Sequence, residues 1–207
     1  MTNYWDSRFL CHLKKGDVKT IFEIGARTGE ESIELSKVFD NSTIYSFECN
    51  PLVIDKTKEV LKPYENIHFY THGLGDKNEI LPFYSFMECN TGASSLFKRF
   101  DFNQTQHESG KVHIKKLIDF VKENNIEKID LLCMDVQGYE LNILKGAEDF
   151  ISKIDYIILE EPKGDNVSYI GAPTALEIAN FLKKNNFVEI ERLQENLIED
   201  NVMYKRT

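Results

Sequence analysis

The chain has 207 residues, 42% of them hydrophobic, and its 34 acidic and 25 basic side chains give a formal net charge of −9. This length fits a single domain with a sizeable core. The negative charge opposes binding along a phosphate backbone and provides no polybasic membrane signal, so we expect neither a nucleic-acid partner nor membrane insertion.

The cysteine spacing and the first residues bear on the compartment. Cys11, Cys49, Cys89 and Cys133 lie far apart without C-x-x-C spacing, which argues against a zinc cluster and against a disulfide framework. The first residues lack a basic region followed by an apolar run, and no apolar stretch reaches the roughly 18 residues of a membrane span. We expect a cytoplasmic protein with reduced thiols.

Strand and helix patterns alternate along the first third of the chain. Apolar runs rich in β-branched and aromatic residues predict strands, and apolar residues at helical spacing predict helices between them. The expected order is strand 20–24, helix 30–38, strand 43–47, helix 52–61 and strand 67–70. This βαβαβ unit indicates a parallel sheet, which binds its ligands at the carboxyl ends of the strands.

The first strand ends in the pattern acid-x-Gly-x-x-x-Gly, formed by Glu23, Gly25 and Gly29. Gly25 lets the backbone leave the strand tightly and approach a ligand, and Gly29 lets the next helix begin against that ligand. Glu23 would attract a cationic α-amino group and repel a dinucleotide diphosphate. With Arg27 and Thr28 completing the turn, the pattern favours S-adenosylmethionine over the cofactor of a dehydrogenase, although a plain strand-to-helix turn uses the same glycines.

A second acid follows the next strand. Glu48 lies at about the offset from the glycine turn at which an acid binds the ribose of a nucleoside. Cys49 and Asn50 share its loop, because Pro51 fits the first turn of the following helix. The alternative is an exposed charge at a strand end.

The alternation of helix and strand continues in the second half. We expect helix 114–124, strand 129–134, helix 140–144, strand 156–159 and helix 174–185, followed by strands 188–193 and 201–205. A closing hairpin-like pair on a parallel sheet indicates one antiparallel strand. Residues 85–111 form a polar insert without a regular pattern, too long for an ordinary connection, and are a candidate substrate lid.

The segment 134–147, MDVQGYELNILKGA, resembles the D-V-E-G-x-E…L-K-G-A signature of FkbM-type methyltransferases, and shorter matches at 23–26, 47–51 and 91–96 keep the family's order. The resemblance implies a single class I, Rossmann-like α/β domain over residues 1–207, with a mostly parallel seven-stranded sheet, one antiparallel strand and helices on both faces. It also implies S-adenosylmethionine as donor and a hydroxyl acceptor on a sugar or a natural product. Gln137 and Arg27 depart from the family pattern, in which Glu and a small polar residue are usual.

Acids after the fourth and fifth parallel strands are candidates for the chemistry. Methyl transfer to a hydroxyl needs a base that removes its proton; Asp135 is the first candidate, although it could instead cap the next helix. Glu140, about one helical turn further on, could share the site or stabilise the helix N-terminus. Side chains alternate along a strand, so only one of Glu160 and Glu161 faces the cleft; the sequence does not decide between them, and we select Glu161. Asp135 and Glu161 could also hold Mg²⁺.

Three further positions are assigned by the resemblance. Gly75 and Asp76 match the region that contacts the adenine in this fold, or they form a short turn. Ser94, in the G-A-S-S loop, would close over the donor or bind an acceptor sugar, or it would only satisfy backbone groups.

We therefore expect a cytoplasmic S-adenosylmethionine-dependent O-methyltransferase that modifies a sugar hydroxyl on a nucleotide sugar or glycan intermediate, as part of carbohydrate biosynthesis. One alternative is a divalent-cation-dependent O-methyltransferase of a small phenolic or polyketide-type product. Another is a cofactor-binding module without turnover. The sequence leaves open whether the protein forms a homodimer.

Overall fold

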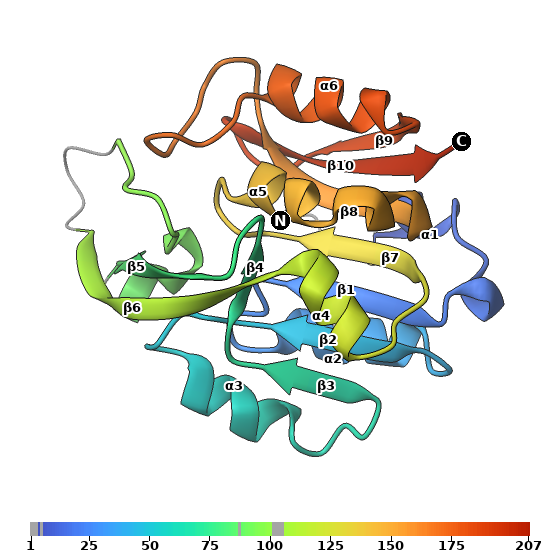
Figure 1. Cartoon of the computed structure of the whole chain (residues 1–207), viewed down its shortest axis with the longest axis horizontal. Helices are drawn as coiled ribbons and strands as arrows, with labels where there is room; N and C mark the ends of the chain where they lie inside the picture. Colours follow the sequence, from blue (N-terminus) through green and yellow to red (C-terminus); the bar gives the residue numbers. More distant parts are fainter. Residues whose placement is uncertain (1–3, 5, 87, 101–105) are drawn as a thin grey trace.

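A central sheet organises the protein, for which a computed structural model describes residue 4 and residues 6–86, 88–100 and 106–207. Its seven strands lie in the order β3-β2-β1-β7-β8-β10-β9 (Figure 1). They are β1 (Thr20–Ile24), β2 (Thr43–Phe47), β3 (Ile67–Tyr70), β7 (Ile129–Met134), β8 (Ile154–Pro162), β9 (Phe187–Gln194) and β10 (Glu199–Arg206). Strand β10 runs antiparallel to both of its neighbours, whereas β1, β2, β3, β7 and β8 are mutually parallel. The prediction of a mostly parallel sheet with one antiparallel strand is confirmed.

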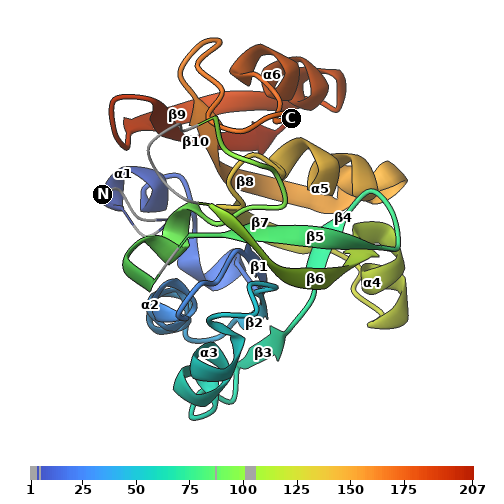
Figure 2. The ribbon, with the colours of Figure 1, turned by 90° about the vertical axis from the view of Figure 1, so that its left-hand side faces the viewer.

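Helices cover both faces of this sheet (Figure 2). One face carries α1 (Ser7–Leu10), α2 (Glu30–Val38) and α3 (Ile54–Leu61), and the other carries α4 (Leu117–Glu123), α5 (Glu140–Gly146) and α6 (Ala175–Lys184). Because successive side chains of a strand point to opposite faces, Leu131 packs into one core and Leu132 into the other. This double burial explains why all six residues of β7 are buried.

A smaller sheet projects from the edge at which the parallel strands end (Figure 1). It consists of β4 (Gly73–Gly75), β6 (His107–Lys116) and β5 (Glu79–Ser85), in that order, and the short helix η2 (Glu88–Ala93) follows β5. Two expectations are corrected here, because 107–111 belong to a strand rather than an irregular insert, and 114–116 continue that strand rather than beginning a helix. Val112 and Ile114 are buried at alternate positions, which is the periodicity of a strand. Of the expected lid 85–111, residue 85 ends β5 and 88–93 form η2, whereas residues 87 and 101–105 lie outside the described residues.

Two further short helices, η1 (Lys15–Asp17) and η3 (Glu148–Lys153), precede β1 and β8. Within the described ranges, the helices are too short and too polar to cross a membrane. The described cysteines Cys11, Cys49 and Cys133 are free thiols.

Candidate active site

A cavity of about 920 Å³ opens at the carboxyl ends of β1, β2, β7 and β8. Its walls come from the loops that leave these strands, from η2, and from the turn between β9 and β10. Of the residues selected from the sequence, the cavity is lined by Gly25, Arg27, Thr28, Glu48, Cys49, Asn50, Ser94 and Asp135.

The glycine turn after β1 brings two backbones into contact. Gly25 has φ = +97°, and a Cβ at this position would collide with the carbonyl oxygen of Asp135. Only glycine therefore satisfies both the conformation and the close approach. Gly29, with φ = +87°, begins α2 against Leu61 instead of lining the cavity.

Glu48 is held by the backbone on both of its carboxylate oxygens. The amide of Arg27 donates to Oε2 and the amide of Asn50 donates to Oε1, each at 2.6 Å. Burial raises the pKa of Glu48 to about 7, although these two donors act in the opposite direction. Each oxygen keeps a second lone pair, so the carboxylate can accept further hydrogen bonds from a ligand in the cavity that it lines.

Glu23 lies behind the turn and does not line the cavity. Its Oε2 accepts hydrogen bonds from the hydroxyls of Ser32 at 2.6 Å and Ser46 at 2.9 Å, which tie α2 and β2 to β1. Its Oε1 is buried and has no partner among the described residues. Burial raises the pKa of Glu23 to about 7. The structure thus places Glu23 as a support of the turn, in contrast to the expected direct contact with a ligand.

The register between β7 and β8 decides which acid joins Asp135. Met134 pairs with Leu159, so the next residues along the two strands, Asp135 and Glu160, lie side by side at the cavity. The amide of Gln137 bridges them, because its Nε2 donates to Asp135 Oδ1 at 2.7 Å and to Glu160 Oε2 at 2.8 Å. The Oε1 of the same amide accepts from the Tyr169 hydroxyl at 2.6 Å. Burial raises the pKa of Asp135 to about 6 and, with the charge of Asp135 added, raises that of Glu160 as well.

Glu161 and Glu140 lie outside the cavity, in contrast to our selection from the sequence. Glu161 points to the opposite side of β8, where it accepts hydrogen bonds from Tyr204 at 2.6 Å and from Arg192 at 2.9 Å. Glu140 is buried in the first turn of α5 and accepts from the amides of Val136 and Gly138 at 3.2 and 3.3 Å. It therefore folds the loop that presents Asp135, which matches the structural alternative.

Of the three positions assigned by the family resemblance, one lines the cavity and two do not. Gly75 and Asp76 lie outside the cavity, since Gly75 belongs to β4 and packs against Tyr139, whereas Gly73 and Leu74 contribute to the lining. Ser94 does line the cavity, and its buried hydroxyl has no partner among the described residues.

The expected Mg²⁺ pair is not brought together. Asp135 and Glu161 face different surroundings, and Glu160, the acid beside Asp135, shares the Gln137 amide with it. Within the described residues, no group of three or more His, Cys, Asp and Glu side chains has a geometry that could hold a metal ion.

The strand order, the glycine turn and the acid after β2 define a class I, Rossmann-like methyltransferase fold. The model of the methyltransferase FkbM domain family matches residues 23–189, and the chain belongs to this family. It is a methyltransferase by family.

Two relatives cover most of the chain. It is 29% identical over 185 residues to Methyltransferase 1 of Beauveria bassiana, with 80% of this chain and 73% of the relative covered. It is 23% identical over 158 residues to the 2-O-methyltransferase NoeI of Sinorhizobium fredii, with 72% of this chain and 65% of the relative covered. The chain thus spans somewhat less than two thirds of NoeI.

Two solved structures share the fold. Methyltransferase FkbM from Methylobacillus flagellatus superposes with a TM-score of 0.61 at 18% identity, over 91% of this chain and 44% of that one. Aeropyrum pernix fibrillarin, solved with natively bound S-adenosyl-L-methionine, superposes with a TM-score of 0.56 at 10% identity, over 90% of this chain and 66% of that one.

Proposed function

We propose that this protein transfers a methyl group from S-adenosylmethionine to a hydroxyl oxygen of a sugar acceptor. The observation that carries the proposal is that one cavity is lined both by Glu48, whose carboxylate could accept ribose hydroxyls, and by Asp135, an acid whose raised pKa suits proton removal near neutral pH.

The chemistry of the first half of the cavity fits the donor. Gly25, Arg27, Glu48 and Asn50, which we call the donor side, would hold the nucleoside and methionine parts. When bound, the donor supplies a methyl carbon activated by a sulfonium. Fibrillarin, which has the same fold, binds this molecule.

Asp135 is the group we assign to proton removal. A base works best when its pKa lies near the operating pH, and burial raises the pKa of Asp135 to about 6. The Gln137 amide fixes the orientation of the carboxylate, because it is held from its other end by Tyr169. The acceptor hydroxyl would therefore meet an ionised, oriented carboxylate above about pH 6.

A hydroxyl acceptor is supported by the likeness to NoeI, a 2-O-methyltransferase that is 23% identical to this chain over 158 residues. The cavity adds polar side chains at its far side, including Gln137, Asn196 and Asn201, and groups of this kind bind sugar hydroxyls. The cation-dependent alternative for phenolic acceptors lacks a comparable observation, since the described residues offer no metal cluster.

The test begins with isothermal titration of S-adenosylhomocysteine into the purified protein, with and without EDTA. We expect micromolar binding that the chelator leaves unchanged, followed by mass-spectrometric detection of methylated product in a panel of sugars and nucleotide sugars. Absence of binding would refute the donor assignment. Binding without any product would favour the alternative of a cofactor-binding module. Product that forms only with added Mg²⁺ would favour the cation-dependent alternative.

A further inference from the structure

One side of the cavity is lined by carboxylates from four separate elements. Glu31 lies on α2, Asp135 follows β7, Glu160 lies on β8 and Glu199 begins β10. We call this set the acid wall. Glu195, in the turn between β9 and β10, adds a further carboxylate to the same cavity.

These carboxylates act on one another. The charges of Glu199 and Glu195 raise the pKa of Asp135, and the charges of Asp135 and Glu199 raise that of Glu160, in both cases after the larger effect of burial. Asp135 also contributes to the raised pKa of Glu31, again after burial. The members of the acid wall are therefore close enough for their negative charges to oppose each other.

Within the described residues, few positive charges lie near the carboxylates of the acid wall. No Lys, Arg or His of the described chain forms an ion pair with Glu31, Asp135, Glu160 or Glu199. The basic side chains that line the cavity are Arg27, Lys56 and Arg99. Arg27 donates to Thr91 at 3.1 Å and partly offsets the charge near Asp135, and Arg99 lies over the rings of Phe86 and Tyr169. Glu160 and Asp135 share a single amide donor, and Glu199 accepts from Asn196 at 2.8 Å.

The donor would balance only part of this charge. S-adenosylmethionine has a sulfonium and an ammonium group against one carboxylate, so it brings one net positive charge. In the ligand-free protein, protons held by acids such as Glu31 and Glu160 offset part of the remaining charge, and a cationic acceptor could replace them. A second observation is that the Ser94 hydroxyl, buried in the wall of the same cavity, has no hydrogen-bond partner among the described residues. Buried polar groups are normally satisfied, so this hydroxyl is available to a polar group that enters the cavity.

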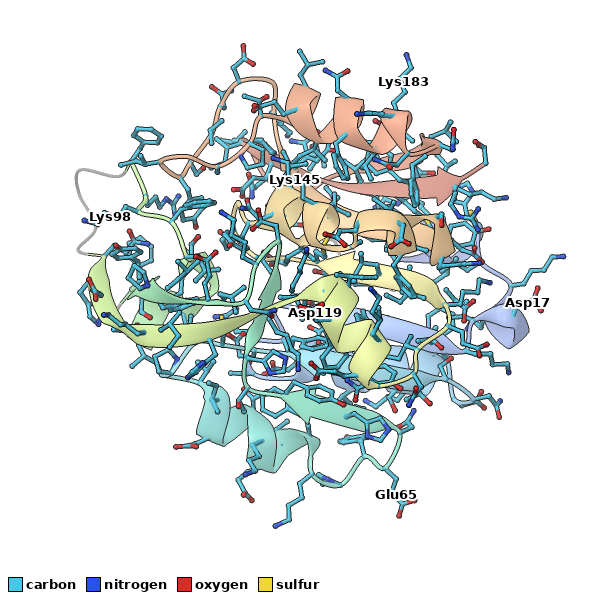
Figure 3. All side chains as sticks on the ribbon, in the orientation of Figure 1. Asp17, Glu65, Lys98, Asp119, Lys145 and Lys183 are labelled. Carbon is cyan, nitrogen blue, oxygen red and sulfur yellow. The ribbon has the colours of Figure 1, made fainter. Side chains whose placement is uncertain are left out.

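We infer that the acceptor carries an ammonium group beside the hydroxyl that is methylated, as in an amino sugar, and that Glu160 and Glu199 bind this ammonium. The inference rests on the proposed function and narrows its substrate class. A nucleotide-sugar diphosphate would instead meet the acid wall with charge of the same sign. The Lys98 ammonium, which could pair with a diphosphate, lies over the ring of Tyr84, and Lys98 does not line the cavity (Figure 3).

The test measures binding, so that it does not depend on turnover. Methyl glucosaminide, with a free amine, and its N-acetylated counterpart are titrated separately into the protein saturated with S-adenosylhomocysteine. We expect the amine to bind at least about tenfold more tightly, which is the size of effect that a charge-assisted hydrogen bond gives. In Glu199→Gln this preference should fall to about one tenth or less of its wild-type value, while the affinity for S-adenosylhomocysteine stays unchanged.

Two variants complete the design. Glu160→Gln provides the same test from β8 in case Glu199→Gln disturbs the turn that Asn196 and Glu199 hold together. Glu65→Gln removes one negative charge from an exposed position that is outside the cavity, and it should keep the full preference (Figure 3). Equal binding of the two sugars, or a preference that survives both Glu199→Gln and Glu160→Gln, would overturn the inference. Loss of S-adenosylhomocysteine binding in the wild-type protein would instead refute the proposed function.

Discussion

The two sides of the cavity satisfy their carboxylates in different ways. On the donor side, each oxygen of Glu48 accepts a backbone amide at 2.6 Å, so the acid is fixed before any ligand arrives. On the acid wall, Asp135 and Glu160 divide one side-chain amide between them. Backbone donors hold a carboxylate rigidly, which suits a cofactor that is always the same. A shared side-chain donor leaves negative charge that a bound acceptor can neutralise.

The largest effect that would separate the two sides of the cavity is expected from neutralising Asp135, the proposed base, while leaving the donor side intact. Asp135→Asn should lower turnover by about 10² to 10⁴-fold, because proton removal is lost, and should change the affinity for S-adenosylhomocysteine by less than about threefold. Turnover assays and calorimetry on the same preparation check both values. A variant that methylates sugars at the wild-type rate would show that Asp135 is not the base.

The reciprocal change acts on the donor side. Glu48→Ala should weaken binding of S-adenosylhomocysteine by about ten- to a hundredfold, since it removes the acceptor that we propose for the ribose hydroxyls and leaves the amides of Arg27 and Asn50 without that partner. Calorimetry gives the affinity, and circular dichroism confirms that the variant is folded. Glu65→Gln is the matched control, and unchanged affinity in Glu48→Ala would move the nucleoside away from this acid.

A substitution of Gln137, whose amide is shared by Asp135 and Glu160, should have a smaller effect on turnover and tests whether the amide controls the ionisation of Asp135. In Gln137→Glu a third carboxylate would replace the donor, which makes ionisation of Asp135 harder and moves the acidic limb of the pH–rate profile upward by about one unit. Turnover near pH 6.5 should fall about threefold and recover at higher pH. A limb that stays in place would mean that the amide does not control the ionisation of Asp135. Gln137→Met, which removes both hydrogen bonds without adding charge, separates the two contributions.

The smallest predicted effect concerns the ligand-free protein. Burial raises the pKa of Glu31 to about 8 and those of Glu23 and Glu48 to about 7, so the folded state keeps protons that the unfolded chain has already lost. This contribution to stability is complete below the unfolded pKa of about 4.3 and is lost as pH rises through the folded values. We expect the melting temperature at about pH 6 to exceed that at about pH 8.5 by roughly 5 °C. Glu31→Gln should flatten this dependence, and a melting temperature that increases with pH would contradict it.

The sequence predicts the sheet better than it predicts the site. The strand and helix order around β1, β2 and β7 follows from apolar runs long enough to be read locally, and Gly25 reveals its role through spacing alone. The choice between Glu160 and Glu161 depends on the register of β8 against β7, which no local pattern specifies, and our selection of Glu161 fell on the far side of the strand. The contacts of Gln137 with Glu160 and Tyr169 join residues more than 20 positions apart, so no local sequence pattern predicts them either.

The contact between Gly25 and the carbonyl of Asp135 has a consequence for how this site can change through evolution. No side chain separates the backbone at Gly25, which we propose to hold the donor, from the backbone at Asp135, our proposed base. A substitution that shifts one of them by even a fraction of a bond length displaces the other, because packed backbones transmit strain. Under the proposed function, donor recognition and proton removal would therefore change together, whereas Glu160 on β8 and Glu199 on β10 lie outside this backbone contact and could vary with the acceptor.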